Sequence, residues 1–257
     1  MLSLQNRITV NSLGGLTGLA KIVSNYGFLN FWDTESLTIS GTTTTYIDRL
    51  GVHNLPNPAA ANQATYSASD SDFNNKPSLD YDGTTDYNYK AFNNYRGGDS
   101  DGAFYFVFKT GATLSATHPI ISFSDESTNN EKLLIFTDSA QKLGCLLNNG
   151  ANIYSQATTT TLATNTVYVG KIESNGSTYK ISINNVDQTI NMVFGVNNGN
   201  WFNSLTTLTN ISIGARINTS SIYSNAKIVC VGYSPLQSGV NDAALITSLG
   251  AYYGKTI

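Results

Sequence analysis

The sequence predicts a single all-β domain, an antiparallel jelly-roll sandwich of two sheets, with one short helix at its C-terminal end. Short apolar or alternating runs of strand length occur along most of the chain. Clusters of Asn, Gly and Ser separate these runs, as turns separate the strands of a sandwich. A length of 257 residues allows one large all-β domain or two small ones, and we expect one.

The N-terminal segment, residues 1–27, lacks this turn rhythm. It combines a short β-like piece, a Gly14-Gly15 break and a small apolar segment. Such a segment is either an extra strand of the sandwich or a separate arm. We expect an arm that serves assembly or attachment, because the strand pattern begins at Phe28. The jelly-roll domain is therefore assigned to residues 28–257.

Within the domain, the expected strands show two patterns. Residues 104–108 (FYFVF) and 133–136 (LLIF) are continuous apolar runs, as expected where a strand is covered on both faces. Residues 87–91 and 179–183 alternate between apolar and polar side chains, which is the pattern of a half-buried strand. Turn clusters such as residues 148–150 (NNG) lie between the runs.

One helix is predicted near the C-terminus, between Ser238 and Gly254. Ser238 is a suitable N-cap, and Gly254 can end the helix. Apolar residues between them recur at helical spacing and would form one buried stripe, which comprises Val240, Ala244, Leu245, Leu249 and Tyr252.

Charged residues are unusually few. They make up 12% of the chain, against roughly 25% in an average soluble domain. The amide and hydroxyl surface that remains suits extracellular β proteins, fibres and carbohydrate binders. A net charge of -3 offers no positive field for phosphates, so we expect no nucleic-acid partner. We also expect no membrane insertion, because no run of about 18 apolar residues occurs and the N-terminus does not resemble a signal peptide.

The cysteines and histidines limit metal and redox chemistry. Cys145 and Cys230 each lie in a β-like apolar run, and we expect two buried free thiols, since a disulfide would require neighbouring strands. With two cysteines, and with His53 and His118 as the only histidines, the counts exclude a cysteine-based or histidine-based metal site.

Four motifs follow one another in a defined order. Residues 32–33 (WD) lie near the start, and residues 77–83 (PSLDYDG) form a Pro-x-x-x-Phe-Asp-Gly type of turn with Tyr81 in the Phe place. Residues 213–216 (IGAR) come late, and residues 252–254 (YYG) end the expected helix. This order resembles the concanavalin A-like lectin/glucanase superfamily, in its laminin-G- or pentraxin-like form, of the kind found in phage virion and surface-binding proteins. The resemblance extends from Phe28 to the end of the chain and implies the two-sheet jelly roll.

The acidic stretch 76–90 (KPSLDYDGTTDYNYK) has two interpretations. It is either a corner between strands, or a ligand or cation contact made by Asp80, Asp82 or Asp86. We expect a corner, because Asp82 can accept hydrogen bonds from its own turn and Gly83 tolerates a positive φ.

A second acidic loop, residues 96–102 (RGGDSDG), contains Asp99 and Asp101. Their spacing allows both carboxylates to face one hard cation such as Ca²⁺. No third aligned Asp and no downstream Glu completes the oxygen shell, so we expect a solvated turn, with a cation site as the alternative. Asp99 and Asp101 are the candidate metal ligands, and we expect no other cofactor.

Catalysis is not expected. Retaining glucanases of this superfamily need two carboxyl groups about 5 Å apart, supplied by a Glu-x-Asp-x-Glu array on one strand. No such array is present, because the only glutamates are Glu35, Glu126, Glu131 and Glu173. A Ser-based triad is not expected either, because neither His53 nor His118 has a visible partner in the sequence.

Two functions remain. We expect first a non-enzymatic virion surface protein, such as a bacteriophage head fibre, spike, decoration or tail-fibre domain, in which residues 1–27 attach the domain to the particle or to sister subunits. An initiator Met without a signal peptide, a Lys-poor and Asn/Thr-rich composition, and one jelly roll filling the chain favour this hypothesis. The alternative is a carbohydrate-binding module or surface adhesin, extracellular or on a bacterial cell surface.

The expected partners follow from these hypotheses. The apolar side chains of residues 1–27 would need cover, so we expect a homo-oligomer, with a trimer as the first expectation, and contacts with other virion proteins. A host-surface glycan is a further possible partner. Four aromatic residues that look exposed could stack on sugar rings, with packing under a loop as the alternative for each; they are Tyr95, Tyr154, Trp201 and Tyr223.

Overall fold

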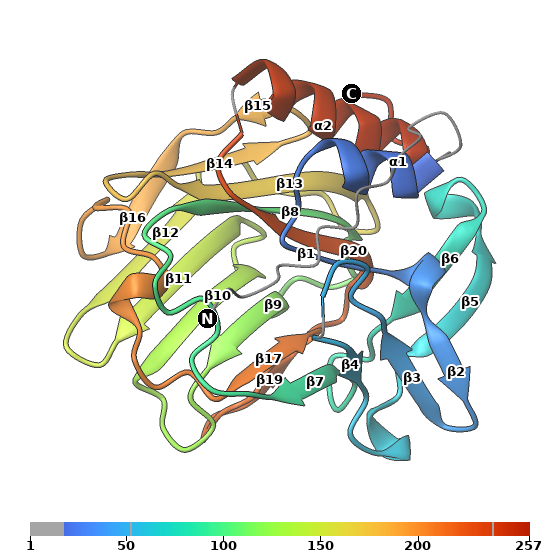
Figure 1. Cartoon of the computed structure of the whole chain (residues 1–257), viewed down its shortest axis with the longest axis horizontal. Helices are drawn as coiled ribbons and strands as arrows, with labels where there is room; N and C mark the ends of the chain where they lie inside the picture. Colours follow the sequence, from blue (N-terminus) through green and yellow to red (C-terminus); the bar gives the residue numbers. More distant parts are fainter. Residues whose placement is uncertain (1–17, 52, 238) are drawn as a thin grey trace, which may run out of the picture.

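A computed structural model describes residues 18–51, 53–237 and 239–257. Within these residues, two α-helices and two large antiparallel sheets make up most of the fold (Figure 1). The helices are α1 (Gly18–Asn25) and α2 (Gly239–Tyr252). Short 3₁₀ helices also occur, and they are η1 (Thr34–Ser36), η2 (Ala60–Asn62), η3 (Ser71–Phe73) and η4 (Phe202–Ser204). The prediction of an all-β sandwich with a C-terminal helix is confirmed.

The two large sheets pair strands that are distant in sequence. The eight-stranded sheet has the order β15 (Val186–Asp187), β14 (Tyr179–Ile183), β13 (Val167–Ser174), β8 (Gly102–Lys109), β20 (Lys227–Ser234), β6 (Lys76–Asp80) and β5 (Thr65–Asp70), and β1 (Asn30–Asp33) also pairs with β20. The seven-stranded sheet has the order β16 (Ile190–Phe194), β12 (Ile153–Thr158), β11 (Leu143–Asn149), β10 (Glu131–Thr137), β9 (His118–Ser124), β17 (Asn210–Ile213) and β7 (Asn88–Ala91).

Two small sheets complete the architecture. One has the order β2 (Thr38–Ser40), β3 (Thr43–Tyr46) and β4 (Leu55–Pro56), and the other is the hairpin of β18 (Ala215–Arg216) and β19 (Ile222–Tyr223). The first packs against β7 and the second against β9, so both lie along the seven-stranded sheet.

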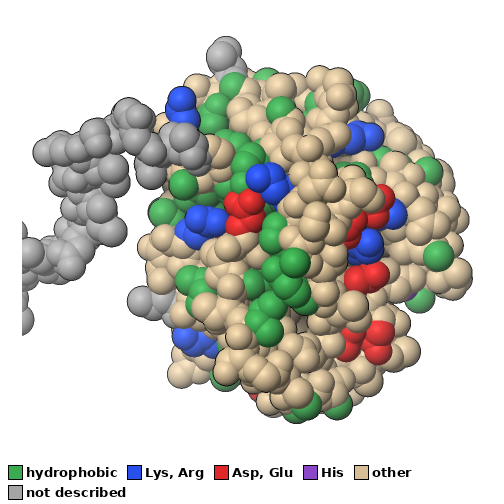
Figure 2. All heavy atoms as spheres, turned by 90° about the vertical axis from the view of Figure 1, so that its right-hand side faces the viewer, with side chains coloured by type: hydrophobic (Ala, Val, Ile, Leu, Met, Phe, Trp, Pro, Cys, Tyr) green, Lys and Arg blue, Asp and Glu red, His purple; other side chains and the backbone are tan. Residues whose placement is uncertain are grey.

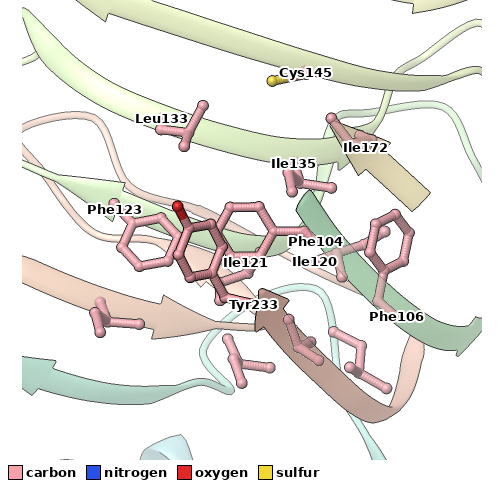
Figure 3. Close-up of a cluster of buried hydrophobic side chains, with 14 of the residues drawn as sticks. Phe104, Phe106, Ile120, Ile121, Phe123, Leu133, Ile135, Cys145, Ile172 and Tyr233 are labelled. Atoms are coloured by element: carbon pink, nitrogen blue, oxygen red, sulfur yellow. The ribbon is translucent and has the colours of Figure 1, made fainter. Parts of the chain in front are cut away.

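The main core lies between the two large sheets. It is rich in aromatic rings, and Figure 3 shows Phe104 and Tyr233 from one sheet facing Phe123 of the other. The ring centroids of Phe104 and Tyr233 are 4.8 Å apart, and those of Phe104 and Phe123 are 5.5 Å apart. Both contacts are tilted, and aromatic contacts of this kind add to the hydrophobic gain from burial.

A second apolar cluster lies on the other face of the eight-stranded sheet, under both helices. Tyr105 and Val107 of β8 belong to it, whereas Phe104 and Phe106 belong to the main core. Because alternate residues of a strand point to opposite faces, this explains why residues 104–108 form a continuous apolar run. The prediction that this strand is covered on both faces is confirmed.

Helix α1 corrects the expected domain boundary. Leu19 and Val23 are buried in the second cluster, and α1 packs against α2. Residues 18–27 therefore belong to the folded domain, and the expectation that all of residues 1–27 form a separate arm is wrong for this part. The reason is that Leu19 and Val23, four residues apart, lie on one face of a helix, and this face is buried in the second cluster. Residues 1–17 lie outside the described residues, and their role in assembly stays a prediction.

Helix α2 ends as expected, but its buried stripe is shifted. Gly254 has a φ of +78°, the conformation that favours glycine after a helix. The buried residues of the helix include Leu245, Ile246 and Leu249, whereas Ala244 is exposed. The predicted N-cap, Ser238, lies outside the described residues.

The acidic stretch 76–90 is a corner, as predicted. The Asp82 carboxylate accepts hydrogen bonds from the backbone N–H groups of Thr84 at 2.8 Å, Thr85 at 2.8 Å and Asp86 at 3.1 Å, and Gly83 has a φ of +78°. These bonds hold the pKa of Asp82 below its ordinary range despite the opposing effect of burial. The carboxylate is thus used by its own turn.

Both cysteines are buried free thiols, as predicted. Burial raises the pKa of each, so neither has the thiolate character of a reactive cysteine. Among the described residues, no helix has the length and apolar character needed to cross a membrane.

Candidate functional site

The outer face of the seven-stranded sheet can be traced from the strand register. Tyr89 of β7 lies opposite Ser212 of β17, which lies opposite Ser122 of β9, and Ser122 lies opposite Leu134 of β10. Along β17 and β9, the next residues to Ser212 and Ser122 are Ile211 and Phe123, whose side chains belong to the main core. The row therefore points away from the main core.

The β18–β19 hairpin covers the middle of this face. The hydroxyl of Ser124 donates a hydrogen bond to the carbonyl of Ile217 at 2.8 Å, and the hydroxyl of Ser212 donates to the carbonyl of Ala215 at 2.7 Å. The side-chain amide of Asn210 also donates to Ile217 at 3.0 Å. The hairpin thus covers the centre of the face, and the part beside β7 lies to one side of it.

Three tyrosines gather on that part of the face, and we call them the tyrosine platform: Tyr87, Tyr89 and Tyr223. Tyr89 lies on β7, Tyr87 directly precedes that strand, and Tyr223 comes from β19 of the hairpin. The ring centroids of Tyr87 and Tyr89 are 6.2 Å apart, and those of Tyr87 and Tyr223 are 5.9 Å apart. All three side chains are half-buried, so each ring is both supported and accessible.

The platform has a carboxylate at one end. The hydroxyl of Tyr89 donates a hydrogen bond to Oε2 of Glu126 at 2.8 Å. Burial, and then this hydrogen bond, raise the pKa of Tyr89, so its hydroxyl stays protonated at neutral pH. Glu126 is exposed and keeps oxygen lone pairs that can accept hydrogen bonds from a ligand.

A groove runs beside the platform, between β7 and the small β2–β3–β4 sheet. It has a volume of about 480 Å³ and is lined mainly by apolar surface, contributed by Thr45, Asn54, Pro56, Pro58, Tyr89, Lys90 and Ala91. Tyr89 borders both the groove and the platform. An apolar groove that continues into aromatic rings with hydroxyl and carboxylate acceptors offers stacking and neutral hydrogen bonds together.

Two of the four aromatic residues expected to be exposed are in fact core residues. The ring of Tyr95 stacks on Phe123 at 4.9 Å, and its side chain is 4% exposed. Trp201 is fully buried, and its indole N–H donates to the hydroxyl of Tyr233 at 3.2 Å. The expectation of exposed rings is wrong for both. Both residues are flanked by polar loop residues, which suggested exposure. The main core extends beneath those loops and includes both rings.

The other two residues expected to be exposed, Tyr154 and Tyr223, are half-buried. They lie in different parts of the molecule. Tyr154 lies on β12 and packs against the edge of the main core, whereas Tyr223 belongs to the platform. Sequence reasoning missed Tyr87 and Tyr89 as site residues. Their i, i+2 spacing placed them on one face of a strand, but nothing in the sequence brought Tyr223 to that face.

The predicted calcium ligands are partly used by protein contacts. Oδ2 of Asp99 accepts a hydrogen bond from the hydroxyl of Tyr233 at 2.9 Å and lies 3.9 Å from Nε of Arg96. Asp99 and Asp101 line a small cavity of about 260 Å³. No group of three or more His, Cys, Asp or Glu side chains that could hold a metal occurs in the described part of the chain. The expected solvated turn and the alternative of a calcium site at Asp99 and Asp101 therefore both remain untested.

Glu126 and Glu131, which flank the loop of residues 127–130, are tied to structural contacts. Glu131 accepts hydrogen bonds from the backbone N–H groups of Thr206 at 2.7 Å and Thr207 at 2.6 Å. These bonds hold the pKa of Glu131 below its ordinary value despite burial, so it is an ionised acceptor rather than a proton donor. Glu126 is bound to Tyr89 as described above.

Comparison with known proteins rests on structure, because no protein-family model and no curated protein sequence matches the chain. A similar solved structure is the CBM40 module of the Ruminococcus gnavus IT-sialidase bound to α2,6 sialyllactose. Its TM-score is 0.51 at 13% sequence identity, and the alignment covers 67% of this chain and 95% of the module.

Two larger proteins contain a similar part. The Trypanosoma rangeli sialidase has a TM-score of 0.58 at 12% identity, over 86% of this chain and 32% of the sialidase chain. Botulinum neurotoxin type C, described as dependent on two ganglioside molecules for cell entry, has a TM-score of 0.55 at 14% identity, over 88% of this chain and 52% of that chain. At such low identity the likeness concerns the fold alone. The chain therefore shares its two-sheet β-sandwich fold with a sialidase carbohydrate-binding module and with parts of a sialidase and a neurotoxin.

Proposed function

We propose that this protein is a non-catalytic glycan-binding protein whose tyrosine platform contacts the sugar. The observation that carries this proposal is the gathering of three supported, accessible rings beside an apolar groove, with Glu126 as an acceptor at one end. Aromatic rings stack on the apolar faces of sugars, and neutral hydroxyl and carboxylate groups bind sugar hydroxyls. The sialyllactose-bound module and the ganglioside-dependent toxin share the fold, which supports glycans of these kinds as the first to be tested.

The absence of catalysis is part of the proposal. Hydrolysis by a retaining mechanism requires a pair of carboxyl groups, one acting as an acid and the other as a nucleophile. Glu131 is held by two backbone N–H groups and Glu126 by Tyr89, so each carboxylate already has a structural role. We expect no release of reducing sugar from polysaccharides. Sustained release that is lost in Glu126→Gln or Glu131→Gln would contradict this part of the proposal.

We further propose that the protein is displayed on a virion surface, as a head fibre, spike, decoration or tail-fibre domain of a bacteriophage. Figure 2 shows one face of the molecule, on which charged side chains form small separate groups between hydrophobic side chains and a larger area of uncharged side chains and backbone. Such a surface supports contacts through neutral hydrogen bonds. The alternative is a bacterial carbohydrate-binding module or adhesin. Neighbouring portal, capsid or tail genes would support the virion proposal, and neighbouring polysaccharide-utilisation genes would favour the alternative.

The binding site is tested by removing the rings. Tyr87→Ala, Tyr89→Ala and Tyr223→Ala should each weaken binding of a glycan found on a sialoglycan and ganglioside array by about tenfold, the loss expected for about 1.4 kcal/mol of stacking. The matched control is Tyr66→Ala on β5, because this ring is 39% exposed and lies on the other sheet. Titration calorimetry measures both. Equal affinities for the wild type and all three platform variants would refute the site.

A further inference from the structure

Two cationic side chains, Lys132 of β10 and Arg216 of β18, lie close together on the outer face of the seven-stranded sheet. Lys132 is opposite Ser124 of β9, whose hydroxyl donates to the carbonyl of Ile217 in the β18–β19 hairpin. Burial, and then the charge of Arg216, lower the pKa of Lys132, so the two cations are near enough to repel each other. We call these two residues the cation pair.

Both members of the pair are withdrawn from water, and few acceptors reach them. Lys132 is 5% exposed, and its ammonium group donates to the two oxygens of Asn129. The side-chain amide of Asn218 donates to the same Asn129 side-chain oxygen at 3.0 Å. Arg216 is half-buried, and its Nε is buried without a hydrogen-bond partner. Its Nη2 donates to the carbonyl of Ser220 and is the one guanidinium nitrogen with an acceptor in the described part of the chain.

The protein itself supplies no counter-charge to the pair. Among residues 18–51, 53–237 and 239–257, no carboxylate lies within ion-pair distance of either cation. The adjacent Glu131 is held by backbone N–H groups instead. Lys171 shows the usual arrangement, since its side chain is 3% exposed and pairs with Glu173 at 3.0 Å and with Asp242. Buried Lys and Arg side chains are rarely left unpaired, because a charge taken out of water is costly.

We propose that the cation pair binds an anionic group, a carboxylate or a sulfate, carried by the glycan that the tyrosine platform contacts. Arg216, which is partly exposed, would donate charge-assisted hydrogen bonds to the anion. Lys132, which lies deeper, would add its positive charge. A polyanion such as nucleic acid fits less well, because the positive charge is confined to two residues of a chain with a net charge of -3. This inference rests on the proposed function and names the class of glycan.

The position of the pair sets the size of the ligand. Arg216 lies opposite Ile222 in the hairpin, and the next residue, Tyr223, belongs to the platform. In the sheet order, β10 is three strands from β7, which is about 14 Å at the usual strand spacing. The hairpin packs on β9, between these two strands. A ligand that reaches both sites is therefore an oligosaccharide that crosses the hairpin, with its anionic sugar at the β10 end.

The first test uses an array of neutral, carboxylated and sulfated glycans. The wild type should prefer charged members, and reducing the carboxyl group of the best ligand to an alcohol, or removing its sulfate, should weaken binding at least about tenfold. Arg216→Gln and Lys132→Met should each lose about tenfold for the charged glycan and bind the uncharged form as the wild type does. Lys21→Met is the matched control, because Lys21 is an exposed lysine of α1. It should bind both forms like the wild type, as measured by titration calorimetry.

Thermal unfolding separates a lost anion site from a damaged hairpin. Lys132→Met removes a buried charge and its repulsion with Arg216, so at pH 7 it should melt no lower than the wild type. The same variant should nevertheless bind the charged glycan more weakly. A purely structural role of Lys132 would instead leave the preference for the charged form over the uncharged form unchanged.

Inorganic sulfate separates the anion from the glycan that carries it. At matched ionic strength, replacing sodium chloride by sodium sulfate should raise the melting temperature of the wild type and Lys21→Met more than that of Arg216→Gln and Lys132→Met. Equal gains in all four proteins, or equal affinity of the wild type for charged and uncharged glycans, would overturn the proposal. A sulfate effect specific to the pair without any preference for charged glycans would assign the pair to a free anion. Failure of all glycans to bind would count against the proposed function, and the sulfate result would still decide whether the pair holds an anion.

Discussion

The ring of Tyr81 lies directly against the backbone of Gly214. A Cβ atom built on Gly214 would lie 2.3 Å from Cε1 of that ring, and Gly214 has a φ of +81°. The hydroxyl of Tyr81 donates a hydrogen bond to the side chain of Asn88 at 3.0 Å, which keeps the buried ring in place. The motifs at residues 77–83 and 213–216, far apart in the sequence, are thus in contact, because the Tyr81 ring of one packs on Gly214 of the other.

Gly214→Ala should destabilise the protein strongly. The substitution adds a methyl group where the ring already lies and forces a residue other than glycine into the left-handed region, at a combined cost of about 2–5 kcal/mol. Gly150→Ala is the control, because Gly150 has a similar φ of +82° but no atom within 4 Å of the added Cβ. It should cost about 1 kcal/mol. Urea unfolding measures both, and equal losses would mean that the contact with Tyr81 is unimportant.

Leu19→Ala should also lower stability, by about 2–4 kcal/mol, because Leu19 is 2% exposed in the cluster beneath α1 and α2. Ser24→Ala changes an exposed position of the same helix and should have an effect below about 0.5 kcal/mol. Thermal unfolding compares the two variants. If Leu19→Ala melts like the wild type, α1 is not part of the folded domain and the boundary at residue 27 should be restored.

Lys132 should make stability depend on pH. Burial and the nearby Arg216 lower the pKa of Lys132 to about 8, and its ammonium group donates hydrogen bonds to the backbone carbonyl of Asn129 at 2.7 Å and to its side-chain carbonyl oxygen at 2.6 Å. Among the described residues, no carboxylate lies within ion-pair distance of Lys132. Because the folded-state pKa lies below the ordinary value of about 10.4, the charged form destabilises the fold.

The sign of the effect follows from proton linkage. Between about pH 8 and pH 10.4 the unfolded chain binds more protons than the folded chain, so this contribution to stability rises with pH. Lys132→Met removes the cost of burying the charged ammonium group, but it also removes the hydrogen bonds to Asn129. At pH 7 it should stabilise the protein by about 1–2 kcal/mol, and this gain should disappear by about pH 10. Denaturant unfolding at both pH values measures it. A difference from the wild type that does not change with pH would show that Lys132 is not the titrating group.

Calcium should leave the melting temperature nearly unchanged. The Asp99 carboxylate already accepts a hydrogen bond from Tyr233 and pairs with Arg96. Asp101 is the one other carboxylate residue that lines the same cavity. If the loop bound calcium, a free calcium concentration of 100 times the dissociation constant would add about 2.7 kcal/mol to the free energy of unfolding. Scanning calorimetry with calcium and with a chelator gives the comparison. A rise of several degrees, lost in Asp101→Ala, would mean that the loop recruits enough further oxygen atoms to hold the ion.

The sequence by itself determined the fold class and several local structures. Period-two alternation, the apolar run at residues 104–108 and the Asn- and Gly-rich turns define strands through local sterics and burial, so an all-β sandwich could be predicted. The corner at Asp82-Gly83 was equally local, because the carboxylate binds N–H groups within four residues. Such features need no knowledge of the rest of the chain.

Only the tertiary structure decided where the candidate site lies. Tyr223 reaches Tyr87 because the β18–β19 hairpin folds over the seven-stranded sheet, and no local pattern encodes that contact. Tyr95 and Trp201 follow polar loops and yet are buried, because the aromatic core extends under those loops. Whether an aromatic ring is exposed depends on which distant segments cover it. Burial is a property of the whole packed chain, whereas strand and turn formation depend on neighbouring residues.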